Sequence, residues 1–231
     1  ALNPCTGVGM PSLENVRRRR LSDTEIIKFW NSLDSEEINM SKRISLTLRL
    51  YLATAARRGE VSGAAWAEFD INGARWILPA ERAKNGIEHL VPLSGLALSI
   101  LKELRAATAD ARGESKWLVP SPSSNKPIVS VTVNQALGRS LPFIGLQNLT
   151  PHDLRRTAAT LMGRLGVQRF IISRVLNHVD RSITGRYDVH EYYAEKKDAM
   201  DKLGAHIENL LAAGTADCLT SAPLGHIEGF S

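Results

Sequence analysis

The stretch that most constrains this chain is Leu149–Leu161, LTPHDLRRTAATL, because it combines a helix start with a cluster of basic side chains. Thr150 suits an N-cap and Pro151 the first helical position, since neither position needs a free backbone N–H. His152 and Arg155 then share one face beside the positive end of the helix dipole. Such a face suits a phosphate group. From this stretch alone, the alternative is a solvated basic surface.

The length and charge of the chain limit its class. Its 231 residues can form one large domain or two small ones, and a net charge of +5 with a pI near 9.4 favours an anionic partner. No apolar run approaches the roughly 20 residues that span a bilayer, and no secretory signal is evident, so we expect no membrane partner. Cys5 and Cys218 lack metal-ligand spacing and favour a reducing compartment. Because the chain begins without Met, we expect a fragment or a processed piece.

Residues 1–20 contain prolines and glycines and end in four consecutive arginines, Arg17, Arg18, Arg19 and Arg20. This composition predicts an extended basic linker whose charges lie along a polyanion. The alternative is a solvated arm without a partner.

Hydrophobic periodicity predicts helices over most of the remaining chain. A capping-box pattern from Ser22 to Glu25 starts the first helix. The other predicted helices cover 41–56, 61–66, 94–109, 130–141, 151–165, 168–176, 182–189 and 194–211. Strand patterns cover 69–73, 75–78 and 89–93, with a polar hairpin over 81–88. We predict a mainly α fold with a small three-stranded antiparallel β-sheet (α+β), followed by a tail with little periodicity from residue 214.

Four polar clusters lie at the edges of apolar segments. They are Arg57 with Glu60, Lys84 in the hairpin, His152 with Arg155, and His178 followed by Tyr187. Each cluster alone has an ordinary alternative as a surface charge, a helix-ending histidine or a packed aromatic residue. Together, two arginines, a lysine, two histidines and a tyrosine, without a paired carboxylate site, suit metal-independent attack on a phosphodiester.

In this set of side chains a tyrosine would be the nucleophile. With a pKa near 10, its hydroxyl is only about 0.1% ionised at pH 7, roughly 4 kcal/mol from full ionisation. It therefore needs a nearby base or a strongly positive field. Arginines would offset the charge of the transition state, and a lysine can protonate the leaving oxygen, which removes the need for Mg²⁺. A phosphotyrosine ester would keep the bond energy for religation, so we expect no ATP and no other cofactor.

At these residues the sequence resembles the tyrosine recombinases, or phage integrases. Five motifs match in order, and the interval of nine residues between His178 and Tyr187 is the usual one in that family. The motifs are LATAARRGEV (52–61), AKN (83–85) followed by VPLS (91–94), TPHDLRRT (150–157), VLNH (175–178) and SITGRY (182–187). The resemblance implies the catalytic-domain fold of that family and site-specific DNA recombination through a 3′-phosphotyrosine intermediate.

The resemblance also implies roles for the charged side chains. Arg57 and Arg155 would hold the scissile phosphate, and Lys84 would be the general acid toward the 5′-oxygen. Glu60 would support the arginines rather than take part in the chemistry. Arg156 is expected to be a contact to the DNA backbone or a surface charge.

The remaining roles belong to two histidines and a tyrosine. His152 would take or return the tyrosine proton, and His178 would bond a non-bridging oxygen. Tyr187 would attack the phosphorus and hold the 3′-end of the DNA. Tyr192 and Tyr193 are rival nucleophiles, ranked lower because neither keeps the interval from His178.

Two positions depart from the family pattern. Ala55 stands where a glycine is common in the first motif, and Asn177 where a glycine is common before the histidine. We expect these changes to affect local packing more than chemistry.

The resemblance implies a linker over 1–20, a catalytic domain over 21–212 and a C-terminal tail over 213–231. The implied partner is double-stranded DNA, bound by a homo-tetramer of the full-length protein, with accessory DNA-bending or directionality factors. We expect a cytoplasmic, nucleoid-associated protein of a bacterium or phage that integrates or excises a mobile element. The alternatives are a non-cleaving DNA-binding accessory protein of the same fold and a type IB topoisomerase.

Overall fold

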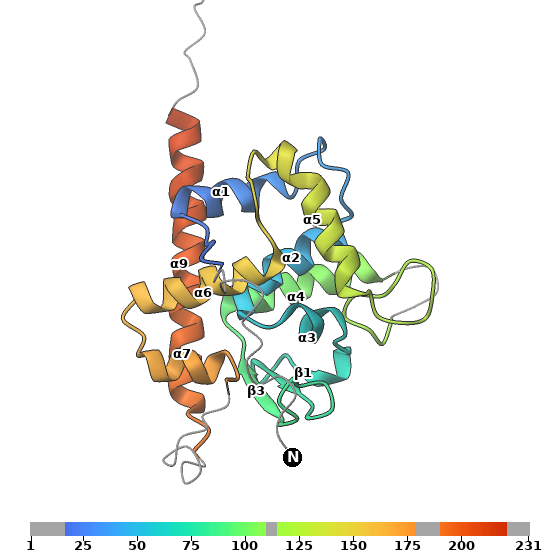
Figure 1. Cartoon of the computed structure of the whole chain (residues 1–231), viewed down its shortest axis with the longest axis vertical. Helices are drawn as coiled ribbons and strands as arrows, with labels where there is room; N and C mark the ends of the chain where they lie inside the picture. The colour runs from blue at the N-terminus through green and yellow to red at the C-terminus, as the bar shows by residue number, and fades with distance from the viewer. Residues whose placement is uncertain (1–16, 110–114, 179–189, 221–231) are drawn as a thin grey trace, which may run out of the picture.

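The computed structural model describes residues 17–109, 115–178 and 190–220, apart from the side chains of 215–220. Helices make up most of this structure, and the small sheet lies at one end of it (Figure 1). The elements are α1 (Asp23–Ser32), α2 (Lys42–Thr54), α3 (Arg58–Ser62), the 3₁₀ turn η1 (Trp66–Glu68), β1 (Phe69–Asp70), β2 (Arg75–Leu78), β3 (His89–Pro92), α4 (Gly95–Thr108), α5 (Ser130–Ile144), α6 (Pro151–Arg164), α7 (Arg169–Val175) and α9 (Tyr193–Thr220).

Helix α2 lies at the centre of the core. Every residue from Ser45 to Thr54 is buried, and the helix packs against both α4 and α6. Such burial on all faces explains why its sequence is rich in leucine. Its buried charged side chain, Arg49, pairs with Asp34 at 2.6 Å and donates to the carbonyl of Trp30 at 2.8 Å, which offsets part of the cost of burying the charge.

The sheet is antiparallel with the strand order β1-β2-β3, as the sequence predicts. Trp76 in β2 pairs with Phe69 in β1 and with Val91 in β3, and it is almost fully buried. The Phe69 and Trp76 rings stack at 5.2 Å between centroids, which is a favourable cross-strand pair. The β2–β3 connection carries the predicted polar hairpin, where Gly86 adopts a positive φ of 69°.

Helix α6 begins as predicted, with Thr150 at the N-cap and Pro151 at the first helical position. The carboxylate of Asp153 accepts hydrogen bonds from the backbone N–H of Thr150 at 2.9 Å and from its hydroxyl at 2.7 Å. A carboxylate at this position also suits the positive end of the helix dipole. The start of α6 is therefore fixed by a buried acidic side chain that the sequence pattern did not single out.

One predicted helix is wrong in position. The sequence suggested that the polar residues 57–60 interrupt the helical run and that a short helix covers 61–66, but α3 covers Arg58–Ser62. The reason is local, because the carboxylate of Glu60 accepts a hydrogen bond from the backbone N–H of Arg57 at 2.9 Å. The polar residues thereby begin a helix instead of ending one.

The C-terminal helix is longer than predicted. Helix α9 continues past Leu211 to Thr220, although Gly214 was expected to begin an aperiodic tail. Gly214 serves close packing, since a Cβ there would lie 2.7 Å from Cγ2 of Ile27 in α1. In the part of the chain that the structure describes, no helix, α9 included, is long and apolar enough to cross a membrane.

Candidate active site

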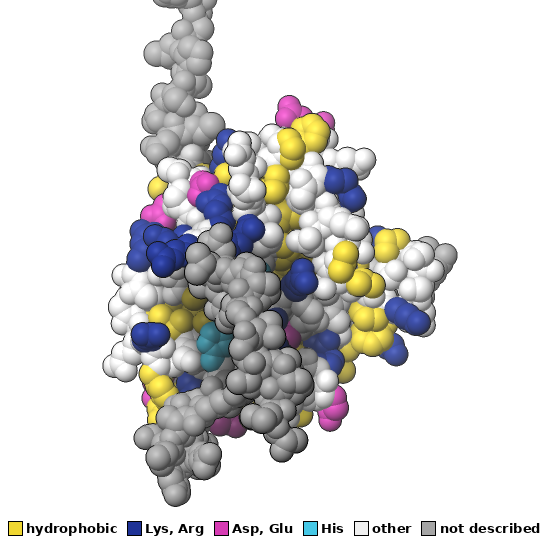
Figure 2. Space-filling model, viewed as in Figure 1, with side chains coloured by type: hydrophobic (Ala, Val, Ile, Leu, Met, Phe, Trp, Pro, Cys, Tyr) yellow, Lys and Arg dark blue, Asp and Glu magenta, His cyan; other side chains and the backbone are white. Residues whose placement is uncertain are grey.

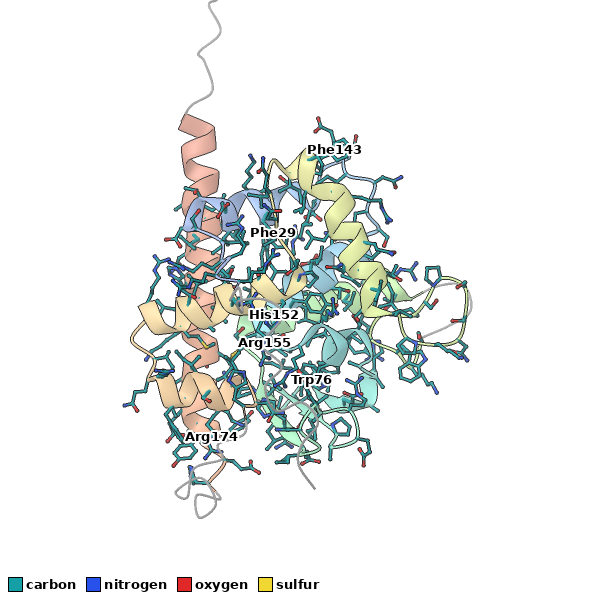
Figure 3. The ribbon with its side chains drawn as sticks, in the orientation of Figure 1. Phe29, Trp76, Phe143, His152, Arg155 and Arg174 are labelled. Atoms are coloured by element: carbon teal, nitrogen blue, oxygen red, sulfur yellow. The ribbon has the colours of Figure 1, made fainter. Side chains whose placement is uncertain are left out.

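A pocket of about 840 Å³ lies where the α2–α3 connection, the β2–β3 hairpin, the start of α6 and the end of α7 meet. Its lining comprises Ala56, Arg57, Arg58, Lys84, Asn85, Asn134, Thr150, Pro151, His152, Arg155, Asn177 and His178. Five of the six predicted catalytic residues are among them. The sixth, Tyr187, lies outside the described residues, as does the predicted helix 182–189. Figure 3 labels His152 and Arg155, which lie next to each other at the beginning of α6.

Arg155 is buried between two helix ends. Its Nη1 donates to the carbonyl of Ala55 at 2.7 Å, and its Nη2 donates to the carbonyl of Leu176 at 2.5 Å. These carbonyls belong to the C-cap residues of α2 and α7. Burial, together with the charge of Arg57, lowers the pKa of the Arg155 guanidinium to about 10, so it remains protonated at pH 7.

Arg57 is held from two sides. Its Nη1 forms an ion pair with Oε1 of Glu60 at 2.8 Å, and its Nη2 donates to the carbonyl of Asn177 at 3.2 Å. Glu60 is itself buried, and its backbone carbonyl accepts a hydrogen bond from Arg82 at 2.5 Å. The two guanidiniums are thus fixed in one pocket by groups from segments far apart in the sequence.

The two departures from the family pattern share one backbone property. Ala55 and Asn177 both adopt the left-handed conformation, with φ of 52° and 49°. At the end of α7 the N–H of Asn177 bonds the carbonyl of Arg174 at 3.1 Å, and the N–H of His178 bonds that of Ser173 at 3.0 Å. This is a Schellman motif, in which glycine is the usual residue at the left-handed position. The conformation gives a physical reason for the glycines that are common at these positions.

His152 and His178 line the pocket with their rings open to solvent. Partial desolvation, with the charges of Arg156 and Arg155, lowers the pKa of His152. Desolvation and the charges of Arg155 and Arg57 lower that of His178. Both imidazoles are therefore mainly neutral at pH 7, the form that can accept a proton. Among the described residues no group of three His, Cys, Asp or Glu side chains is placed to hold a metal ion.

The β2–β3 hairpin, which carries Lys84, contacts the end of α7 through two asparagine side chains. Lys84 is exposed and lines the pocket. Beside it, the Nδ2 of Asn85 donates to Oδ1 of Asn177 at 2.7 Å, and a longer reverse contact of 3.4 Å joins the same two amides. The sequence reasoning named neither side chain as functional. Only the unusual asparagine before the histidine pointed to this contact.

His89 is a further residue that the motifs did not assign. It is 8% exposed, and its Nε2 lies 3.2 Å from the carbonyl of Val175, so it joins β3 to the last turn of α7. Burial, with the charge of Lys196, lowers the pKa of His89 to about 4. A neutral histidine thus supports the backbone next to the pocket. Its place in an otherwise apolar strand was the only sequence signal.

The predicted DNA-binding arginines divide into two groups. Arg17 and Arg156 both pair with the buried carboxylate of Asp153, at 2.7 and 2.9 Å, and Arg19 pairs with Glu25. Arg18 and Arg20 are exposed and line a hollow of about 580 Å³ beside α6, together with Arg19, Leu21, Ser22, Glu25, Thr157, Thr160, Leu161 and Arg164. Figure 2 shows Lys and Arg side chains gathered on this face near α6.

The rival tyrosines lie away from the pocket. The Tyr192 ring meets Phe170 edge-on at 4.9 Å, and the Arg174 guanidinium lies 5.5 Å from its centroid. Tyr193 is the first residue of α9. Neither tyrosine is among the described residues that line the pocket.

Solved structures of integrases share this fold. The integrase from mycobacterium phage Brujita aligns with a TM-score of 0.63 over 87% of this chain and 63% of its own, at 17% identity. The catalytic core of lambda integrase aligns with a TM-score of 0.56 over 72% of this chain and 95% of its own, at 20% identity. At such identities the likeness establishes the fold alone.

The sequence itself is similar to named integrases. Prophage integrase IntA of Escherichia coli K12 is 32% identical over 179 residues, which is 76% of this chain and 41% of that protein. Prophage integrase IntZ of the same strain is 28% identical over 193 residues, 82% of this chain and 45% of that protein. The chain thus spans less than half the length of these relatives. The profile of the phage integrase family matches residues 19–194, and the chain belongs to this family of tyrosine recombinases.

Proposed function

We propose that this chain is the DNA-cleaving and rejoining part of a site-specific recombinase that integrates or excises a mobile element. The observation that carries the proposal is the pocket in which Arg57, Lys84, His152, Arg155 and His178 meet. Two arginines, two neutral histidines and a lysine supply charge stabilisation and proton transfer at a phosphodiester without a metal ion. The names of the relatives, prophage integrases, support the same reaction.

In this mechanism the arginines hold the scissile phosphate. Arg57 and Arg155 are each fixed by backbone carbonyls, so the guanidiniums are positioned before the substrate arrives. They would donate to the two non-bridging oxygens and offset the charge that develops on them. Glu60 keeps Arg57 in place through their ion pair and takes no part in the chemistry.

Tyr187 is the proposed nucleophile. Its oxygen attacks the phosphorus, the bond to the 5′-oxygen breaks, and the DNA 3′-end remains on the tyrosine as a phosphodiester. His152 accepts the tyrosine proton, Lys84 donates a proton to the departing 5′-oxygen, and His178 donates to a non-bridging oxygen. Reversal of these steps with a different 5′-hydroxyl joins the new strands, so no ATP and no other cofactor is needed.

The proposed partner is double-stranded DNA. Arg18 and Arg20, exposed beside α6, would contact backbone phosphates, and the paired Arg17, Arg19 and Arg156 would do so by exchanging their carboxylates for phosphate.

A solved structure titled as a lambda integrase tetramer bound to a Holliday junction has this fold at 19% identity. We propose a homo-tetramer on DNA for the full-length protein, aided by accessory DNA-bending or directionality factors, in the nucleoid of a bacterial cell. The proposed division is a linker over 1–20, a catalytic domain over 21–212 and a C-terminal tail over 213–231.

The test is covalent capture on a nicked suicide substrate with the cognate site. The wild-type chain, within its full-length protein, is expected to form a protein–DNA adduct in the presence of EDTA. Tyr187→Phe is expected to bind DNA equally well and to form none. An adduct that survives this change or moves to Tyr192 would refute the assignment. Loss of cleavage on chelation would indicate a metal-dependent nuclease, and relaxation of supercoils without strand exchange would indicate a topoisomerase.

A further inference from the structure

A side chain occupies a position where the local backbone suits glycine. Asn177 has a φ of 49° at the end of α7, and an L-residue in this conformation carries a strain that glycine avoids. Asparagine tolerates the conformation better than most residues do, but it gains nothing there from the backbone alone. Its side chain must therefore offset the strain elsewhere.

The contact that does so is the amide pair with Asn85. The Nδ2 of Asn85 lies 2.7 Å from Oδ1 of Asn177, across 92 residues of sequence, and both side chains are half-buried in the pocket wall. Asn85 follows Lys84 directly, and His178 follows Asn177 directly. The pair thus joins the proposed general acid and a proposed phosphate ligand through their chain neighbours.

The hairpin is held on the N-terminal side of Lys84 by the buried side chain of Ala83, whereas the residues between Asn85 and His89 are exposed. In the described structure the side chains of Lys84, Ile87 and Glu88 are exposed, and the Oδ1 of Asn85 accepts a bond from the N–H of Ile87 within the hairpin. Arg82 ties the other end of the hairpin to α3 through the carbonyl of Glu60. Among the described contacts, the one between Asn85 and Asn177 joins the exposed part of the hairpin to the end of α7, while His89 joins the base of the hairpin to the last turn of that helix.

We propose that Asn85 and Asn177 are positioning residues that hold the Lys84 hairpin in the active site before DNA binds. The inference rests on the proposed function and adds that the proton donor of this chain is preorganised by a side-chain amide, which a glycine at position 177 could not supply. Preorganisation of this kind acts on rate, because a proton donor displaced by about 1 Å can cost on the order of 100-fold.

The main test is Asn177→Gly, which keeps the backbone carbonyl used by Arg57 and relieves the strain at φ 49°. Single-turnover cleavage is measured on two suicide substrates, one with the normal 5′-oxygen and one with sulfur in its place. An alkyl thiol is far more acidic than an alcohol, so a thiolate leaves without a proton and the sulfur substrate bypasses Lys84. We expect about 10- to 100-fold slower cleavage of the oxygen substrate and less than about 3-fold slowing of the sulfur substrate.

Three further variants sharpen this result. Asn85→Ala should give the same selective loss, and the double variant should lose no more than either single one, as for two partners of one interaction. In a Lys84→Ala background, Asn177→Gly should not slow cleavage of the oxygen substrate any further. Ile87→Ala is the matched control, since its side chain lies on the same hairpin and is 57% exposed. It should leave the ratio between the two substrates unchanged.

A readout without activity separates this proposal from the proposed function. In the free protein, amide hydrogen exchange over residues 81–88 should become faster in Asn177→Gly and stay as in the wild type in Ile87→Ala. Unchanged hydrogen exchange in Asn177→Gly would overturn the positioning role. Equally slower cleavage of the oxygen and sulfur substrates by this variant would overturn it as well. Faster exchange in Asn177→Gly, together with a wild-type protein that forms no adduct, would support the amide pair and refute the recombinase function instead.

Discussion

Arg155 donates a hydrogen bond at 2.7 Å to the carbonyl of Ala55, a residue 100 positions earlier that is held in the left-handed conformation. The position of this proposed phosphate ligand thus depends on the backbone of a helix end. A change that forces Ala55 out of this conformation would also move the carbonyl that fixes Arg155. Stability and site geometry are therefore coupled at one residue.

The first prediction concerns the side chain at this helix end. Ala55→Val is expected to lower the free energy of unfolding by more than about 2 kcal/mol, because a β-branched residue at positive φ is strained and the site is fully buried. Ala53→Val, equally buried but in the regular helix α2, measures the cost of overpacking alone. Urea unfolding of both variants checks the difference. Equal losses would mean that the left-handed conformation contributes nothing.

The second prediction concerns His89 and pH. Its folded pKa of about 4 lies below the value near 6.5 of an exposed histidine, so the unfolded chain binds more protons between these pH values. The stabilising effect of neutral His89 is therefore present above pH 6.5 and is lost as the pH falls toward 4, by on the order of 3 kcal/mol. His89→Gln can still donate to the carbonyl of Val175 but does not titrate. Urea unfolding at pH 7.5 and 5 should show that the free energy of unfolding falls less in this variant than in the wild type. Parallel curves would contradict the assignment.

The third prediction concerns His152, the proposed proton acceptor. After partial desolvation, the charge of Arg156 is the next cause of the lowered pKa of His152. Arg156→Gln should raise this pKa toward 6.5, and the acid limb of the cleavage profile should move to higher pH in the same direction. Arg156→Lys keeps the charge and is the control. The pKa itself is measured from the imidazole proton shifts of His152 by NMR. If the acid limb moved while the pKa of His152 stayed unchanged, the limb would belong to another group.

The fourth prediction compares the two partners of one ion pair. The side chain of Asp153 is fully buried, and that of Arg17 is 42% exposed. Asp153→Ala leaves the backbone N–H and hydroxyl of Thr150 without an acceptor and should cost about 2 to 4 kcal/mol of unfolding free energy. Arg17→Ala should cost less than about 1 kcal/mol, because exposed pairs contribute little. Thermal unfolding of both checks this. Equal losses would mean that the linker supports α6 as strongly as Asp153 does.

The parts of the fold that the sequence predicts well depend on neighbouring residues. The capping box at Ser22 forms as expected, with Glu25 donating its N–H to the Ser22 hydroxyl at 3.2 Å. The start of α6 at Pro151 and the three-stranded sheet are likewise correct. Each depends on interactions over a few residues or on alternation within one strand, which a single sequence displays.

One prediction failed because it depends on a contact between distant segments. Gly214 looked like a helix end, but it lies inside α9 where Ile27 of α1 approaches closely. A glycine serves either purpose, and only the packing of the two helices decides between them. The polar residues before Val61 were misjudged for a local reason, since the carboxylate of Glu60 starts the helix that they were expected to break.

The sequence named the charged residues of the candidate site but not the groups that support them. The charged motif residues were named from the sequence, and the described ones line one pocket. The groups that hold them are backbone carbonyls and side chains such as His89 and Asn85, with partners 86 and 92 residues away. Backbone carbonyls have no sequence signature, so no pattern could have revealed which of them accept from an arginine.

The C-cap residues of α2 and α7 face the charge of Arg155 with backbone carbonyls rather than with a carboxylate. The last carbonyls of a helix carry partial negative charge, and two such ends converge on this guanidinium. In the described structure Arg155 hydrogen-bonds no carboxylate, so an arriving phosphate has no anion to displace from it. Carbonyls also do not titrate. The hydrogen bonds that position Arg155 are therefore insensitive to acid.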